Sequence, residues 1–305
     1  MRKKIVNSAF LTVFIIHFAF LGIIFVNNYD TIAHAKINFS ANKPLNLEEN
    51  EEIRQFDVSK DDKANKVPVL MYHRIIAEEN LQTGHYNEQG ELYGTIVTKE
   101  QFQEQMEYLH KHDYSTLTLN EFKAYMEEKI NIPKKSILIT FDDGFKDNYI
   151  NAYPVLKEYD MKATLFMITG RIDRDPRDYD PLDAQFLTPE EIESSTDVFD
   201  YVSHTHKFHE RDGNGDAFLI SKPKEEIYDD IQTSIDIIGT NTAFAYPFGA
   251  YDGETLEVLE ELGVELAFTI KDGMAKPGGS LLEIPRRGIY PGTTMDIFEK
   301  LITYE

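Results

Sequence analysis

From Val67 onward, short apolar runs alternate with longer segments in which apolar residues recur at helical spacing. The run 135–141 (KSILITF) is typical of a buried strand, whereas 98–112 places Phe102 and Met106 on one face of a helix. Strands that alternate with helices predict parallel βαβ units. About seven such units in about 240 residues favour a single α/β domain, a distorted (β/α) barrel of about seven parallel strands.

The same pattern predicts where the elements lie. The expected strands cover residues 67–73, 114–119, 135–141, 162–170, 199–204, 242–247 and 265–270. The expected helices cover residues 98–112, 120–128, 147–159, 224–239 and 253–263. Thr98 and Asn120 belong to the residue types that cap helix N-termini, so we expect them to begin the first two helices. Residues 67–305 are therefore expected to form one catalytic domain.

The amino-terminal region has a different texture. Residues 2–4 are basic, residues 9–26 are almost entirely apolar, and Ala-His-Ala at 33–35 offers a small-residue cleavage site. Such a segment is typical of an export signal, and its apolar part is also close to the length of a membrane span. We interpret residues 1–35 as a signal peptide or membrane anchor. Either interpretation places the rest of the chain outside the cytoplasm, secreted or at the cell surface.

Residues 36–66 are rich in charged and polar side chains and show little apolar periodicity. A segment of this composition is usually solvated and extended. We therefore expect a polar linker that holds the domain away from the membrane.

The composition excludes several kinds of site and partner. The chain has no Cys, which excludes disulfides, thiol nucleophiles and thiolate metal sites, so any metal must be held by His and carboxylate groups. The formal net charge of −22 argues against a nucleic-acid partner, because phosphate binding needs a basic face. We expect a monomer that acts on a neutral or cationic ligand.

Unusual residues follow four of the expected strands. His73 ends the first strand, Asp142 and Asp143 follow the third, His204 ends the fifth, and the YPFG motif at 246–249 ends the sixth. In barrels of parallel strands, active sites are built at the carboxyl ends of the strands. These residues are therefore expected to meet in one site.

Three of the nine histidines lie close together, at positions 204, 206 and 209. A separation of five would place His204 and His209 about 140° apart on a helix, so joint metal binding requires a loop. Taken alone, this segment fits a solvated His-rich loop equally well. Together with a carboxylate pair at another strand end, it indicates two imidazoles, one carboxylate and a water around zinc or a similar divalent ion.

The remaining polar motifs have simpler interpretations. His85, His110 and His112 lie in polar or helical contexts and are expected to be solvated. His206 is expected to point away from the metal. Residues 212–216 (DGNGD) resemble a calcium loop but lack its required Glu, so we interpret them as a turn.

The adjacent carboxylates Asp142 and Asp143 can have different functions. Successive residues at a strand end point in different directions, so one Asp can bind the metal while the other acts as general base on water. The cation would offset their mutual repulsion. The alternative is a cap for the helix that follows, which accounts for one Asp and leaves the second Asp and Gly144 unexplained.

Three motifs resemble the polysaccharide deacetylases, carbohydrate esterase family four or the NodB homology domain. They are TFDDG at 140–144, His-Thr-x-x-x-His at 204–209, and the YPFG loop. The resemblance extends from about Val67 to Tyr290. The segments VPVLMYHRI and IPKKSILITFDDG are most similar to the branch that deacetylates poly-β-1,6-N-acetylglucosamine, the intercellular adhesin of biofilms. In that branch the second His follows the first by five residues, as it does here.

The resemblance implies a role for each matched residue. Asp142 would be the general base, and Gly144 would let the chain turn tightly beside the metal. The implied metal ligands are Asp143, His204 and His209. The implied substrate and oxyanion loop comprises Tyr246, Pro247 and Phe248, and the side chains of Tyr246 and Phe248 would line the sugar groove. Within that loop, the backbone N–H of Phe248 would stabilise the oxyanion.

This chain departs from the family pattern at two points. Ala245 stands where most members carry an Arg that orients the base, and Arg286 is expected to replace that Arg in space. No His follows His209, so the late His that serves most members as general acid is missing. In the adhesin-deacetylase branch a His of the MYH strand takes this role, which points to His73. The alternative for His73 is a core histidine that caps its strand.

The resemblance implies metal-dependent hydrolysis of N-acetyl groups on an extracellular hexosamine polymer, poly-β-1,6-N-acetylglucosamine, with release of acetate. Zinc is the expected metal, and cobalt or nickel fits the same donor set. One alternative is the same chemistry on N-acetylglucosamine of peptidoglycan. The other is a degenerate domain that binds glycans without turnover, suggested by the two departures.

Overall fold

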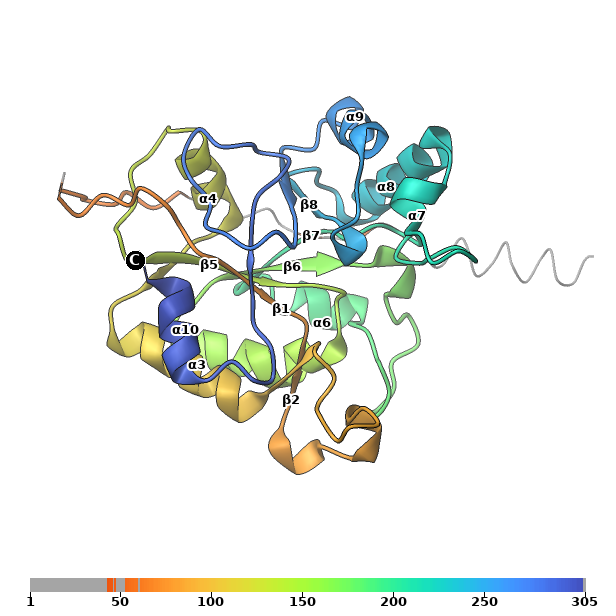
Figure 1. Cartoon of the computed structure of the whole chain (residues 1–305), viewed down its shortest axis with the longest axis horizontal. Helices are drawn as coiled ribbons and strands as arrows, with labels where there is room; N and C mark the ends of the chain where they lie inside the picture. Colours follow the sequence, from red (N-terminus) through yellow and green to blue (C-terminus); the bar gives the residue numbers. More distant parts are fainter. Residues whose placement is uncertain (1–42, 46, 48–52, 60, 304–305) are drawn as a thin grey trace, which may run out of the picture. The chain divides into compact units, whose positions relative to one another are not determined.

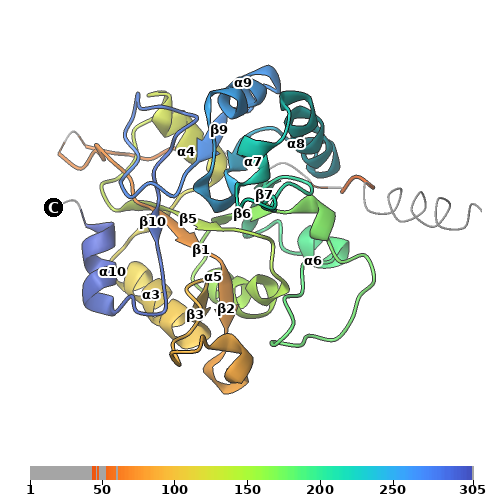
Figure 2. The ribbon, with the colours of Figure 1, turned by 45° about the vertical axis from the view of Figure 1, so that its right-hand side comes forward.

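Parallel strands form the centre of the structure, a computed structural model that describes residues 43–45, 47, 53–59 and 61–303. The main sheet runs in the order β10–β1–β5–β6–β7–β8–β9, and each neighbouring pair is parallel (Figures 1 and 2). These strands are β1 (Val69–Tyr72), β5 (Ser136–Phe141), β6 (Ala163–Met167), β7 (Phe199–Ser203), β8 (Ala243–Ala245), β9 (Leu266–Phe268) and β10 (Arg287–Gly288). The expected α/β fold with parallel strands is confirmed.

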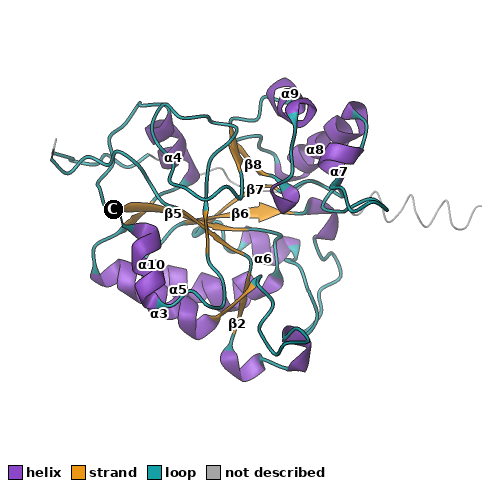
Figure 3. Ribbon diagram, viewed as in Figure 1, coloured by secondary structure: helices purple, strands orange, loops and turns teal. Residues whose placement is uncertain are grey.

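Short additional strands flank this sheet. β4 (Ser115–Thr116) pairs with β5 beside the main path, and β2 (Arg74–Ile76) and β3 (Ile96–Thr98) form a separate parallel pair. Helices surround the strands (Figure 3). They are α3 (Lys99–Lys111), α4 (Leu119–Met126), α5 (Tyr153–Glu158), α6 (Pro189–Glu193), α7 (Phe218–Ser221), α8 (Lys224–Ile238), α9 (Gly253–Glu261) and α10 (Met295–Ile302).

The strands are apolar on both faces because helices or loops cover both. Along β5, Ile139 and Phe141 pack in the cluster that includes Phe102 of α3. The intervening Leu138 points the other way, into the cluster that includes Phe122 of α4. This alternation explains why the sequence shows continuous apolar runs rather than a regular polar and apolar alternation.

Helix starts follow the capping rule, with one correction. Thr98 caps α3 as expected, since its side chain accepts a hydrogen bond from the backbone of Gln101. The expected cap Asn120 is wrong, because Thr118 begins α4. The Thr118 hydroxyl accepts the N–H of Glu121, whose carboxylate accepts the N–H of Thr118 in return. This reciprocal capping box satisfies two backbone donors, whereas a cap at Asn120 would satisfy only one.

The expected helix 147–159 has two parts. Asn148–Ala152 form a π-helical turn, and α5 follows directly. Pro154 lies in the first turn of α5, where its missing N–H removes no α-helical hydrogen bond. The helix therefore accommodates a residue that would interrupt a regular α-helix at this point.

Part of the expected linker packs on the domain instead of being solvated. The backbone N–H of Leu45 donates to the carbonyl of Ile237, and Ala64 is fully buried. The Arg54 guanidinium pairs with the buried carboxylate of Glu121 at 2.6 Å. Isolated residues make these contacts, so no periodic apolar pattern in the sequence predicts them.

The expected signal peptide or anchor, residues 1–35, lies outside the described residues. Among the residues that the structure does describe, no helix combines the length and apolarity needed to cross a bilayer.

His85 is buried, so its expected solvation is wrong. Its Nδ1 accepts the N–H of Gln82, and its Nε2 lies 2.8 Å from the carbonyl of Pro181, to which it donates. His110 and His112 are exposed, as expected. Residues 212–216 form the expected turn, with the Asp212 side chain accepting two backbone N–H groups.

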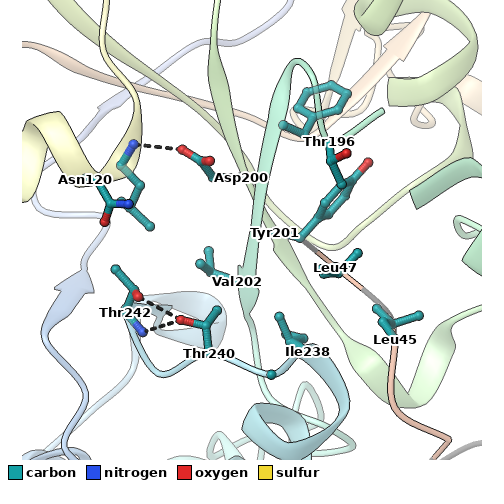
Figure 4. Close-up of a pocket in the computed structure, with 13 residues that line it drawn as sticks. Leu45, Leu47, Asn120, Thr196, Asp200, Tyr201, Val202, Ile238, Thr240 and Thr242 are labelled. Atoms are coloured by element: carbon teal, nitrogen blue, oxygen red, sulfur yellow. Dashed lines mark hydrogen bonds between the residues drawn. The ribbon is translucent and has the colours of Figure 1, made fainter. Parts of the chain in front are cut away.

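A pocket of about 360 Å³ lies at the amino-terminal end of β7, away from the strand ends that carry the candidate catalytic residues (Figure 4). Leu45 and Leu47 line the side opposite Asn120. Asp200 also lines it, and one carboxylate oxygen accepts the N–H of Leu119 at 2.8 Å. Burial raises the pKa of Asp200 to about 6.

This pKa makes the stability of the fold depend on pH in a defined direction. Asp200 binds its proton more tightly in the folded state than in the unfolded state. The contribution of this protonation to the free energy of unfolding is therefore complete below about pH 4 and is lost as the pH rises through about 6. We expect Asp200→Asn, which keeps an oxygen for the N–H of Leu119, to remove this loss. Its advantage over wild type in free energy of unfolding should grow to roughly 3 kcal/mol at pH 7.

Urea unfolding of both proteins at pH 4, 5, 6 and 7 measures this difference. Parallel stability curves over that range would show that Asp200 does not titrate as its burial predicts.

Candidate active site

The carboxyl ends of four parallel strands bring the expected residues to one edge of the sheet. β1 ends before His73, β5 ends before Asp142, β7 ends before His204, and β8 leads into the loop at 246–249. The arrowhead of β6 in Figure 1 points to this edge. Residues far apart in sequence meet here because neighbouring parallel strands end at the same side of the sheet.

Asp143, His204 and His209 form a compact donor set. Their ligand atoms all lie within 4.8 Å of one another. Asp143 Oδ1 lies 3.6 Å from Nε2 of His204 and 3.2 Å from Nε2 of His209. This buried oxygen has no hydrogen-bond partner among the described residues.

The two imidazoles are prepared to act as ligands. His204 Nδ1 donates to the carbonyl of Ala245 at 2.8 Å, which leaves the lone pair on Nε2. Burial lowers the pKa of His204, and burial together with nearby His204 lowers the pKa of His209 to about 4. Both rings are therefore neutral at pH 7. Two neutral nitrogens that face an unpartnered carboxylate oxygen fit a divalent cation, and the donor set suits zinc, cobalt or nickel.

A strained turn directs the two aspartates apart. Asp143 has φ 77° and Gly144 has φ 82°, so two successive residues adopt the left-handed region. Gly tolerates this region freely, whereas Asp adopts it at a cost. The turn leaves Asp142 directed toward Arg286, while Asp143 faces the two histidines.

Arg286 holds Asp142 with two hydrogen bonds. Its Nη1 and Nη2 each lie 2.7 Å from one oxygen of the carboxylate. The guanidinium also donates to the carbonyl of Thr269 and to the hydroxyl of Thr140. Burial by itself would raise the pKa of Asp142, but the charge and hydrogen bonds of Arg286 outweigh it and hold that pKa below its usual value. The residue expected to replace the missing family Arg therefore contacts the expected base.

His73 lies close to the same carboxylate. Its Nε2 is 4.0 Å from Oδ2 of Asp142, and its side chain is partly exposed. Just beyond it, Arg74 Nε donates to Asp147 at 2.7 Å, and the N–H of Ile75 donates to the other oxygen of Asp147. This buried pair ties the segment after His73 to the helix after the aspartates. Sequence reasoning missed it, since neither residue stands out by spacing.

The side chains of the YPFG loop lie in different surroundings. Phe248 has φ 59°, and its ring lies 4.4 Å from the ring of His209, centroid to centroid. The guanidinium of Arg211 lies 4.2 Å from the Phe248 ring centroid. Sequence reasoning also missed Arg211, which precedes the turn at 212–216. Pro247 is buried at the start of the 3-10 turn Pro247–Gly249.

The expectation that the Tyr246 side chain lines the groove is wrong. Its ring is buried and packs on Phe244 and Tyr251, and its hydroxyl donates to the carbonyl of Leu282. The chain turns at Pro247, so the side chain of the residue before it remains in the core. Phe248 is the aromatic residue of this motif that reaches the surface, with 37% of it exposed.

Known proteins with similar sequences are polysaccharide deacetylases. Residues 129–267 match the family model for polysaccharide deacetylase. A poly-β-1,6-N-acetyl-D-glucosamine N-deacetylase of Staphylococcus epidermidis is 31% identical over 268 residues, which cover 85% of this chain and 88% of the relative. The enzyme of the same name from Staphylococcus aureus is 30% identical over 249 residues, covering 79% of this chain and 83% of the relative.

Solved structures agree. A deacetylase of Streptococcus pyogenes, PplD, in complex with acetate, superposes with a TM-score of 0.66 at 26% identity, covering 78% of this chain and 98% of the other. IcaB from Ammonifex degensii shares the fold, with a TM-score of 0.64 at 23% identity and the same coverage. The expected family and the expected N-deacetylase activity are confirmed, and this chain belongs to the polysaccharide deacetylase family.

Proposed function

We propose that this protein hydrolyses N-acetyl groups of an extracellular hexosamine polymer, poly-β-1,6-N-acetylglucosamine, in a metal-dependent reaction that releases acetate. The observation that carries the proposal is the donor set of Asp143, His204 and His209 directly beside Asp142 and His73. The staphylococcal relatives named for that substrate support the choice of polymer. The basic and apolar residues at the amino terminus support action outside the cytoplasm.

Asp143, His204 and His209 hold the metal in this proposal. A divalent ion held there, zinc or alternatively cobalt or nickel, would act as a Lewis acid toward the acetyl carbonyl and would lower the pKa of water. The unpartnered Asp143 oxygen and the neutral Nε2 atoms are the groups that fit it. Phe248 lies at the side of the site next to His209. The backbone N–H of Phe248 would donate a hydrogen bond to the oxyanion, an interaction that stabilises the transition state by about 3 kcal/mol.

Asp142 and His73 move the protons. Asp142 accepts the proton of the attacking water, because Arg286 keeps its carboxylate ionised and fixes both oxygens. His73, in its protonated form, donates a proton to the departing amine. The two groups lie 4.0 Å apart, close enough for both to reach the same acetamido group. A binding module without turnover has no need for this paired arrangement.

The first test is acetate release from N-acetylglucosamine oligomers with β-1,6 linkage. We expect activity to disappear after removal of the metal with a chelator and to return with added zinc. Asp142→Asn removes the base and should lower kcat by about 10²- to 10⁴-fold. Asp229→Asn makes the same chemical change on the exposed face of α8 and should leave kcat unchanged.

Activity that persists after both complete metal removal and Asp142→Asn would rule out this mechanism. The same assay with peptidoglycan fragments separates the substrates, because higher kcat/KM on those fragments would reassign the polymer while leaving the chemistry intact.

His73 has a separate expected signature. We expect His73→Gln to lower kcat by about 10²-fold or more while KM and bound zinc stay unchanged, since His73 donates a proton and does not hold the metal. His112→Gln, which alters an exposed His, is the matched control. Zinc content by elemental analysis and steady-state kinetics measure both effects. Normal kcat in His73→Gln would require another acid.

Arg286 should stabilise the fold as well as the base. Arg286→Met leaves the Asp142 carboxylate buried without its cation and should cost about 3–5 kcal/mol in free energy of unfolding at pH 7. The neighbouring Arg287 pairs with exposed Asp272, so Arg287→Met should cost less than about 1 kcal/mol.

Urea unfolding of the metal-free proteins measures these costs. Adding Asp142→Asn to Arg286→Met should recover part of the loss, because no uncompensated charge remains at position 142. If the double variant is no more stable than Arg286→Met alone, the loss does not arise from the buried charge.

A further inference from the structure

The loop between His204 and His209 has to aim two side chains at the same point. Only residues 205–208 separate the two histidines, and Thr205 adopts a left-handed φ of 74°. A non-Gly residue in this region is strained and persists where its surroundings hold it. The contacts that hold this loop therefore bear on how well the two imidazoles are placed.

One side of the loop rests on the 3-10 turn after β6, Thr169–Arg171. The N–H of Thr169 donates to the carbonyl of Thr205, and the N–H of Gly170 donates to the carbonyl of His206. A Cβ on Gly170 would lie 2.4 Å from that carbonyl oxygen, so only Gly permits the approach. The Thr169 hydroxyl lies 3.0 Å from Nδ1 of His206, so this His faces away from the donor set, toward that turn.

The other side of the loop rests on a buried carboxylate of α8. Asp230 Oδ1 accepts the N–H of His206 at 2.8 Å, and Oδ2 accepts the N–H of Lys207 at 2.7 Å. Two successive backbone donors between the two histidines thus converge on one side chain, which is 8% exposed.

A second residue of α8 supports the other side of His204. Ser234 lies one helical turn beyond Asp230 on the same face. Its hydroxyl accepts a hydrogen bond at 2.8 Å from the hydroxyl of Ser203, the residue directly before His204. Helix α8 therefore holds the chain immediately before the first histidine and between the two histidines.

We propose that Asp230 is a positioning residue that holds the loop 205–208 in the conformation in which His204 and His209 bind the metal, and so sets the metal affinity. This inference rests on the proposed metal site. Only a carboxylate offers a separate oxygen to each of the two N–H groups. Asn offers only one acceptor oxygen. Its side-chain NH2 group is a donor and would point at a backbone N–H, which is also a donor.

The test is the zinc affinity of the full protein, measured by competition with a chromophoric chelator. We expect Asp230→Asn to weaken binding by about 10- to 100-fold, as loss of a supporting partner does in other metal sites. Asp229→Asn, the same change on the adjacent exposed residue, should bind zinc as wild type does. At saturating zinc, Asp230→Asn should regain a kcat within a few-fold of wild type, because it keeps every group that contacts substrate.

Equal zinc affinity of Asp230→Asn and wild type would overturn the inference. Failure of wild type itself to bind zinc would instead overturn the proposed metal site. A measurement on wild type alone covers the case in which Asp230→Asn does not fold. Amide hydrogen exchange should be slow at residues 206–207 without metal, and fast exchange that slows only when zinc binds would show that Asp230 does not pre-position the loop.

Discussion

The active-site edge of this protein depends on the ion pair between Arg286 and Asp142. Two adjacent carboxylates are buried at the end of β5, and such a pair is stable only if each has its own compensation. Arg286 compensates Asp142 with two hydrogen bonds, although 144 positions separate the residues in sequence. Asp143 then keeps an oxygen that faces the two histidines. The division of work between neighbouring aspartates follows from this asymmetry.

The same pair shapes the chemistry. A carboxylate whose pKa is held below its usual value is a weak base, so in the proposed mechanism Asp142 would contribute by being ionised and fixed in orientation. Arg286 is itself fixed by the carbonyl of Thr269 and the hydroxyl of Thr140, which makes the orientation rigid. The loop 205–208 is held in a similar way, since Asp230 and the turn at Thr169 hold its backbone from two sides. In the proposed mechanism, buried polar groups outside the donor set would thus place the groups that react.

Much of the fold was predictable because its signals are local. Continuous apolar runs indicated the parallel strands, a period-3.6 apolar pattern indicated the main helices, and Thr98 was recognisable as a cap. Asn120 was chosen wrongly as a cap because the competing Thr-x-x-Glu box begins two residues earlier. His85, Leu45 and Ala64 were expected in solvent, since isolated buried contacts leave no periodic trace.

By itself, the sequence determined which residue types stand at the strand ends, and hence that His73, the two aspartates and two histidines would meet at one edge. Parallel strands align their ends, so a one-dimensional pattern is sufficient for that inference. Only the tertiary structure decided that the Tyr246 side chain is buried while Phe248 reaches the surface, and that Asp230 and Arg211 lie beside the site. Such contacts depend on where separate helices and loops pack across the sheet, and spacing along the chain carries no record of that packing.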